Sequence, residues 1–168
     1  MNENTTTPAY LPDNKAPIAV QIAEHPFLHG VSDQHLKLLM GCAMPAQFSA
    51  GTFLFREGDP ANRFYLIQSG SVSIEQDGDE MARVQIGTVG PGDCLGWSWL
   101  FPPYYWHFDA RALEPLSALF FYGTRLREEC EADPRLGYEL MKRMAMVVIN
   151  RLQSTRHALA DAVAAQKR

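Results

Sequence analysis

Aromatic side chains gather in one short segment of the chain. Seven of the twelve positions from 97 to 108 are aromatic: Trp97, Trp99, Phe101, Tyr104, Tyr105, Trp106 and Phe108. Planar, polarisable rings can line a pocket for an aromatic, heterocyclic or apolar ligand, which the hydroxyl groups of Ser98, Tyr104 or Tyr105 would orient. Alternatively, the rings pack against one another and fill the interior. The segment is therefore either a pocket or a packed core.

Side chains that could support catalysis or bind a metal do not form recognisable motifs. The sequence has no Ser-His-Asp order with supporting motifs, no His-Glu-x-x-His, no P-loop and no Cys-x-x-Cys. His25, His29 and His35 are interpreted as surface residues rather than ligands. Cys94 is interpreted as a small buried apolar residue, with a reactive thiol as the alternative. We therefore expect neither an enzyme nor a metal site.

Length and composition indicate one globular domain. The chain has 168 residues, of which 46% are apolar and 20% charged, and a net charge of -4. This balance disfavours a broad nucleic-acid-binding face. No apolar run approaches the ~20 residues of a membrane span. Three widely spaced cysteines favour the reducing cytoplasm, and residues 1–17 are expected to be a disordered leader without signal-peptide features.

The rest of the chain alternates between helical and β-type stretches. Residues 18–44 show helical periodicity with a break at His25-Pro26, and Ser32 is placed to cap the second of two short helices. The β-type runs that follow are Thr52–Phe55, Arg63–Gln68, Ser71–Glu75, Met81–Thr88, Ala110–Leu113 and Ser117–Tyr122. Short strands at such even intervals predict an antiparallel sandwich, roll or barrel.

A long helix is predicted towards the C-terminus. Asp133-Pro134 combines an N-cap residue with proline at the first helical position. A seam of residues then recurs at alternate spacings of three and four: Tyr138, Met141, Ala145, Val148, Leu152, Thr155, Leu159 and Ala162. This seam predicts a parallel homodimer, with a monomer whose helix packs on its own β-domain as the alternative. The first half of the helix is expected to pack on that domain, whereas beyond Arg151 no sequence remains to cover the seam.

The glycine-spaced stretch Ala50–Val72 resembles the first half of a cyclic-nucleotide-binding domain, and more closely the effector domain of catabolite-activator (Crp/Fnr) regulators. His25–Leu28, Val89–Gly96 and Arg111–Pro115 fall in the family order. The resemblance implies a mainly β fold, an antiparallel β-roll or jelly-roll with flanking helices and a long dimerisation helix. We accordingly expect a leader over 1–17, a roll with N-terminal helices over 18–132 and the long helix over 133–168.

In this family a short cassette grips the ligand, commonly Phe-Gly-Glu-x-Ala-Leu followed by Pro-Arg-x-Ala-Thr-Val. The Arg neutralises the cyclic phosphate and the Glu accepts from the ribose. At the matching positions this sequence has Trp97 for Glu, Trp106 for Arg and Asp109 for Thr. The pocket residues implied by family position are Gly96, Trp97, Ser98, Trp99, Trp106, His107 and Asp109.

These replacements disfavour cyclic-nucleotide binding in the family manner. The phosphate would lack its counter-charge, and Asp109 beside it would repel it. Arg111 alternates to the opposite face of its strand, so it does not replace the missing Arg. His107 is the one nearby side chain that could become cationic, although a loop position without ligand contact suits it better.

Three functions remain, none of them enzymatic, with no cofactor expected apart from the disfavoured cyclic nucleotide. The first is a small-molecule sensor with altered ligand specificity, and this sensor signals to a protein partner. The second is a ligand-free dimeric scaffold whose pocket is plugged by the aromatic residues. The third is a non-standard cyclic-nucleotide binder that uses helix N–H groups and His107. Family regulators carry a helix-turn-helix domain of about 60 to 70 further residues, so a complete product of this length would not bind DNA directly.

Overall fold

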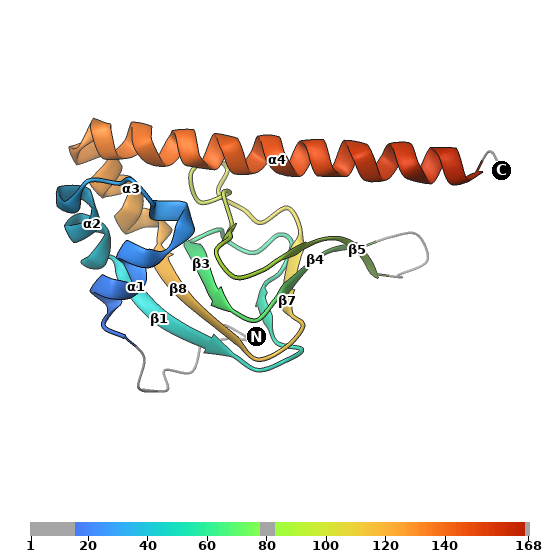
Figure 1. Ribbon diagram of the computed structural model, residues 1–168, viewed down its shortest axis with the longest axis horizontal. Coiled ribbons are helices and arrows are strands. Elements are labelled where there is room, and N and C mark those ends of the chain that lie inside the picture. The colour runs from blue at the N-terminus through green and yellow to red at the C-terminus, as the bar shows by residue number, and fades with distance from the viewer. Residues whose placement is uncertain (1–15, 78–82, 167–168) are drawn as a thin grey trace.

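The computed structural model describes residues 16–77 and 83–166, which form two β-sheets with helices along one side (Figure 1). The elements in chain order are α1 (Ile18–Glu24), η1 (Pro26–Leu28), α2 (Asp33–Met40), β1 (Ala43–Phe48), β2 (Phe53–Phe55), β3 (Arg63–Ser69), β4 (Val72–Asp77), β5 (Arg83–Val89), β6 (Cys94–Leu95), β7 (Asp109–Ala112), β8 (Leu116–Tyr122), α3 (Gly123–Ala132) and α4 (Pro134–Gln166). The expected β-roll with flanking helices and a long C-terminal helix is confirmed. The expected leader lies outside the described residues except for Ala16 and Pro17. Within the described ranges, no helix is long and apolar enough to cross a membrane.

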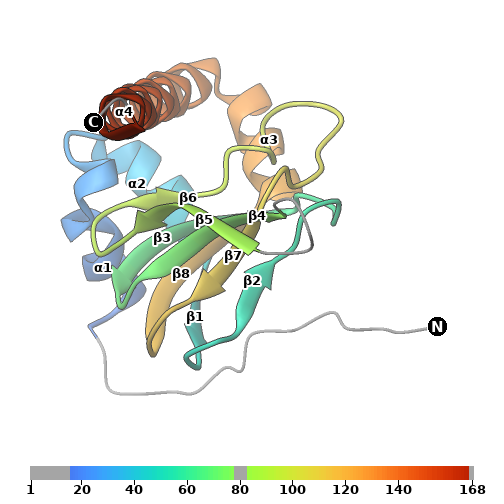
Figure 2. The same ribbon diagram turned by 90° about the vertical axis from the view of Figure 1, so that its right-hand side faces the viewer.

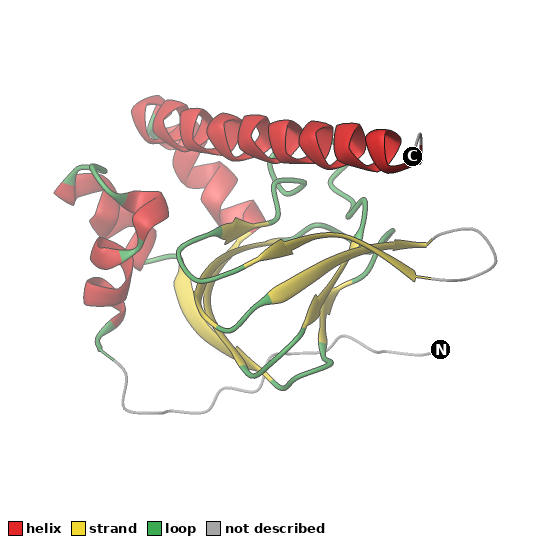
Figure 3. Cartoon of the chain, turned by 45° about the vertical axis from the view of Figure 1, so that its right-hand side comes forward, coloured by secondary structure: helices red, strands yellow, loops and turns green. Residues whose placement is uncertain are grey.

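Two antiparallel four-stranded sheets make up the roll, with strand orders β1-β8-β3-β6 and β2-β7-β4-β5. Both lie on one side of α4 (Figure 3). Successive side chains of β3 point to opposite faces, and both faces are buried. Tyr65 and Ile67 belong to the core inside the roll, whereas Phe64 and Leu66 belong to a second core under the helices. This double burial explains why β3 reads as a continuous apolar run.

The helices cover the outer surface of the first sheet (Figure 2). Leu136, Leu140 and Met144 of α4 are buried there, together with Ile22 of α1 and Leu126 of α3. This packing, rather than helix propensity, holds the short helices in place.

Both predicted helix starts are confirmed. The Ser32 hydroxyl accepts the backbone N–H of His35 at 3.3 Å at the start of α2. Asp133 Oδ1 accepts the backbone N–H groups of Arg135 and Leu136 at 3.1 and 3.4 Å at the start of α4. Each cap satisfies N–H groups that the first turn of a helix leaves without partners.

Two strands were not expected from the sequence. The helical prediction is wrong beyond Met40, where α2 ends, because β1 begins at Ala43. β1 contains Pro45, which an edge strand tolerates because one side of its backbone needs no partner, and β1 pairs only with β8. β6 has two residues, too few to show an alternating pattern. The strand predicted from Met81 starts outside the described residues, which resume with β5.

His25 is not the surface residue expected from the sequence: its side chain is 5% exposed. Its Nδ1 accepts the Phe27 N–H at 3.3 Å, so the proton lies on Nε2, which donates to the Ile67 carbonyl at 3.0 Å. The neutral ring therefore joins the N-terminal helices to β3. Burial lowers the pKa of His25, and the hydrogen bond to Ile67 opposes that shift only in part.

Acidification is expected to destabilise the fold through this histidine. The unfolded chain, where the pKa of His25 is ordinary, binds the proton more readily than the folded chain, so stability falls as the pH drops below that ordinary value. From about pH 7.5 to about pH 5.5, the free energy of unfolding in urea should fall, by at most about 1.4 kcal/mol per pH unit from one group. His25→Gln should flatten this dependence, whereas the control His29→Gln, at an exposed position, should retain it. Equal pH dependence in wild type and His25→Gln would contradict the assignment.

Candidate functional site

The cassette, residues 95–110, begins at Leu95, the last residue of β6, and continues with Gly96. Gly96 has a φ of 91°, a left-handed conformation that favours glycine. A Cβ atom at this position would lie 2.7 Å from Cη2 of Trp106. The glycine therefore allows the indole of Trp106 to lie directly against the backbone.

Trp106 fills the position that the family resemblance gives to the phosphate-binding Arg. Its side chain is 3% exposed and stacks on Phe55 with ring centroids 3.7 Å apart and planes 10° from parallel. The backbone fixes it further, because the Trp106 N–H donates to the Asp59 carbonyl and its carbonyl accepts from Gly58, both at 2.9 Å. Trp106 belongs to the apolar core inside the roll. Trp106 and Phe108 therefore form part of a packed core, whereas Phe101 and Tyr105 of the same segment are exposed.

Trp97, at the position of the family Glu, connects the cassette to α4. Its ring packs on Phe108 at 5.7 Å between centroids and lies 4.9 Å from the guanidinium carbon of Arg151. Arg151 Nη2 also donates to the Cys94 carbonyl at 2.6 Å. Arg151 was missed by the sequence reasoning. The sequence did contain a signal for Arg151, because this residue lies four positions after Val147 on the face of α4 that packs on the domain.

Trp99 belongs to a different core from Trp106, and Ser98 beside it is buried. Trp99 is 1% exposed and belongs to the core under the helices, where it packs on Phe64 at 5.7 Å. Ser98 is 4% exposed, and neither its hydroxyl nor the Trp99 Nε1 has a hydrogen-bond partner in the described part of the chain. Two of the expected pocket residues, Trp106 and Trp99, thus belong to different cores.

Asp109 faces outward, which corrects the expectation that it lies beside the phosphate position. Ala110 and Ala112 of β7 face the roll interior, so Asp109 and Arg111 face the opposite side. Asp109 accepts the Glu57 N–H at 2.8 Å and pairs with Arg83 at 3.2 Å. The like-charge repulsion inferred from its position in the motif therefore does not arise inside the roll.

Arg111 lies on the outer face, as predicted, and is paired there. Its Nε and Nη2 donate to Glu75 Oε1 at 2.9 and 2.5 Å. Burial raises the pKa of Glu75, but hydrogen bonds from Arg111 and Ser73 outweigh it, so the net pKa is lowered. The charge of Arg111 is therefore neutralised by the Glu75 carboxylate.

His107, Cys94 and the acidic residues provide no reactive centre. His107 is exposed. Cys94 is 3% exposed, and burial raises the pKa of its thiol to about 12, so it stays protonated at neutral pH. In residues 16–77 and 83–166, no cluster of three or more His, Cys, Asp or Glu side chains could hold a metal ion.

The first half of α4 packs on the domain as expected, but the seam is not the face that does so and is exposed along its whole length. Leu136, Leu140 and Met144 form the face that packs on the roll. The seam lies on a neighbouring face, and Tyr138 and Leu152 are 66% and 58% exposed. The two faces are distinct because the seam starts out of phase with the buried positions.

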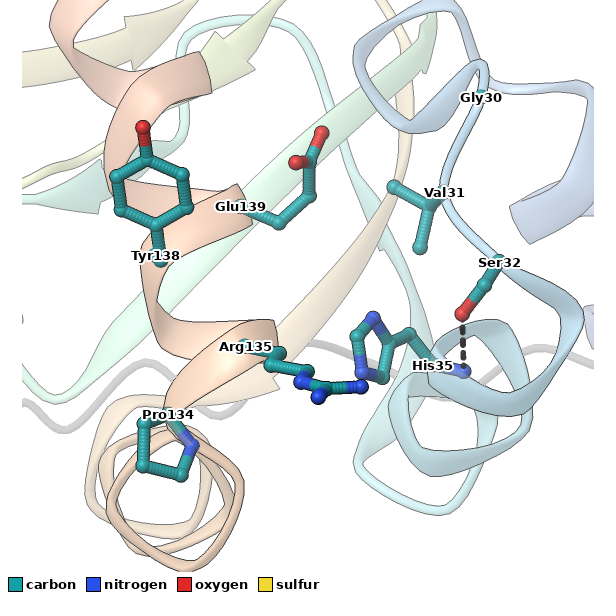
Figure 4. A pocket seen from close by; sticks show the side chains of 8 residues that line it. All are labelled: Gly30, Val31, Ser32, His35, Pro134, Arg135, Tyr138 and Glu139. Carbon is teal, nitrogen blue, oxygen red and sulfur yellow. Dashed lines mark hydrogen bonds between the residues drawn. The ribbon is translucent and has the colours of Figure 1, made fainter.

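A surface hollow of about 490 Å³ borders the seam (Figure 4). Ser32 and His35 line one side, and Arg135 and Tyr138 of α4 line the other. His35 Nε2 lies 3.1 Å from Asp133 Oδ2 and joins α2 to the start of α4. This hollow is separate from the cassette.

Removal of the Trp106 indole should destabilise the fold strongly. Trp106→Ala is expected to lower the free energy of unfolding by about 3–5 kcal/mol, because it leaves a cavity beside Phe55. The control Tyr105→Ala removes a ring that is 48% exposed and should cost under about 1 kcal/mol. Urea denaturation measures both, and similar small losses would show that the indole is not packed.

Comparisons with known proteins agree with this architecture. The sequence profile of the family described as "Cyclic nucleotide-binding domain" matches residues 45–133, more than half of the chain. The "CRP-like cAMP-activated global transcriptional regulator" of Mycobacterium tuberculosis is 26% identical over 142 residues, which cover 84% of this chain. This chain spans 62% of the length of that relative.

Solved structures show the same similarity. The crystal structure of a Geobacter metallireducens protein described as a cyclic nucleotide-binding protein is 31% identical, with a TM-score of 0.68, and the match covers 75% of this chain and 91% of that one. A cyclic nucleotide-binding domain from Methylobacillus flagellatus is 19% identical, with a TM-score of 0.72 and coverage of 86% and 80%, and it supports the fold alone. The chain belongs to the family of cyclic nucleotide-binding domains.

Proposed function

We propose that this chain is a non-enzymatic regulatory domain that acts as a dimeric interaction module and holds no cyclic phosphate at the family position. The Trp106 indole carries the proposal, because it stacks on Phe55 where the family resemblance places the phosphate-binding Arg. Of the earlier alternatives, this geometry favours the plugged scaffold over the altered sensor and the non-standard nucleotide binder.

Electrostatics support the same conclusion. A buried phosphate needs cationic, hydrogen-bonding partners to offset its desolvation. Trp106 offers no charge, and Arg83 and Arg111 are paired with carboxylates on the opposite face of their sheet. A cyclic phosphate would therefore have to displace the indole and would gain no counter-charge from these arginines.

Titration with cAMP and cGMP tests this part of the proposal. All three tryptophans lie within the cassette, so their fluorescence reports on it, and neither nucleotide is expected to change it saturably or to raise Tm. The double variant Trp97→Glu, Trp106→Arg restores the family residues, and cAMP should raise its Tm.

A saturable response of the unmodified protein would overturn the proposal. Arg63 would then be the first candidate for the counter-charge. Its Nε is buried without a hydrogen-bond partner among the described residues, and its guanidinium carbon lies 5.1 Å from the Phe120 ring centroid. Arg63→Gln would show whether the response depends on it.

The exposed seam supports the dimeric part of the proposal. Its residues recur with heptad spacing, and Leu152 and Leu159 are 58% and 64% exposed. In a parallel pair of α4 helices, each seam side chain would pack against the same seam of a second copy. An apolar stripe of this length on a soluble surface typically marks such an interface. Through this pair the module would present a regulatory state to a protein partner.

Charge placed in the seam should therefore dissociate the dimer. Wild-type protein is expected to sediment as a dimer at micromolar concentration, and Leu152→Glu with Leu159→Glu as a monomer. Met146→Glu is the matched control, because Met146 is 56% exposed on α4 but lies outside the seam. A monomeric mass for the wild-type protein would refute the dimer.

A further inference from the structure

A cavity of about 210 Å³ lies between α4 and the turn that joins β5 to β6. Val147, Asn150, Arg151 and Ser154 line it from α4, and Asp93 lines it from the turn. Thr88, Gly92, Cys94 and Phe27 complete it. It lies outside the roll, beyond the edge strand β6, and is therefore separate from the space that Trp106 fills.

Arg151 brings a positive charge to this cavity without a carboxylate partner. Across residues 16–77 and 83–166, no carboxylate oxygen lies within 4.0 Å of its guanidinium nitrogens. Its protein contacts are the Cys94 carbonyl at 2.6 Å and the Trp97 ring at 4.9 Å. A guanidinium has five N–H donors in a fork that matches a carboxylate, and the Cys94 carbonyl occupies one nitrogen.

Arg151 is also partly buried. Burial lowers the pKa of Arg151, and the opposing influence of Asp93 and Cys94 does not restore it. A cation in such surroundings is stabilised by an anion that reaches its free donors.

Asp93 adds a negative charge to the lining of the cavity. One carboxylate oxygen, Oδ2, accepts the Gly90 N–H at 3.0 Å, and Asp93 is otherwise exposed. Asn150 and Ser154 add polar groups to the lining, and Val147 adds an apolar one. A phosphate dianion would meet repulsion from Asp93, whereas a ligand with both charges would find a partner for each of them.

The volume suits a small metabolite. Since one water molecule takes up about 30 Å³ of liquid, the cavity has room for roughly seven waters. We propose that this cavity binds a small zwitterion of the free amino acid class, with its carboxylate on Arg151 and its ammonium group on Asp93. This site does not depend on whether Trp106 occupies the family phosphate position. The amino acid site and the proposed function can therefore be refuted separately.

Thermal shift and calorimetry of the full chain with each of the twenty L-amino acids test the proposal. At least one should raise Tm and bind saturably. For L-valine as the example, isovalerate retains only the carboxylate and isobutylamine only the ammonium group. The amino acid that binds should do so more tightly than either type of analogue. A flat response to all twenty, or equal binding of the analogue that lacks the ammonium group, would overturn the assignment.

Variants connect the response to the two charges. Arg151→Gln should weaken binding about 10- to 100-fold, because it removes a charge-assisted hydrogen bond. Arg156→Gln, at an exposed position further along α4, is the control and should bind as wild type does. Asp93→Asn retains an acceptor for the Gly90 N–H and should lose the preference for the amino acid over its carboxylate analogue. Asp93→Asn tests the proposal even if Arg151→Gln fails to fold. If Asp93→Asn still preferred the amino acid over its carboxylate analogue, the proposal would be contradicted.

Discussion

The contact between the Trp106 indole and the Phe55 ring determines what the interior of the roll can hold. The two rings are parallel at 3.7 Å, and Phe55 in turn packs on Tyr65 and Phe108 at 6.4 and 5.6 Å. The indole is therefore continuous with the core of the roll. Such pairs add about 0.5–1.5 kcal/mol beyond the burial of their area. A polar ligand would have to offset the loss of both contributions.

Strand β7 keeps its own charged side chains out of this interior. On β7, Ala110 and Ala112 face the core, while Asp109 and Arg111 face outward and pair with Arg83 and Glu75. The same sheet thus has an apolar face that accepts the aromatic rings and a charged face that neutralises itself. Family membership supplies the fold, whereas these side chains decide which chemistry the fold can perform.

The sequence predicted most of the architecture because local signals carried it: turn glycines, two helix caps and the periodicity of α4. It failed where the deciding contact is remote in sequence. Nothing near His25 in the sequence indicates that its Nε2–H group will donate a hydrogen bond to the Ile67 carbonyl. Asp109 was predictable in principle, since it must share a strand face with Arg111, but its position in the family motif suggested otherwise. Arg151 was recognisable as a charge on the helix face that packs on the domain.

Helix α4 extends well beyond the last point at which it is held. Arg151 bonds to the Cys94 carbonyl, and residues 152–166 are all exposed (Figure 1). At 1.5 Å per residue, this free part is a rod of about 23 Å. A tilt of the helix by about 5° at Arg151 would therefore move Gln166 by about 2 Å. A displacement of this size at the far end is large enough to alter side-chain packing there.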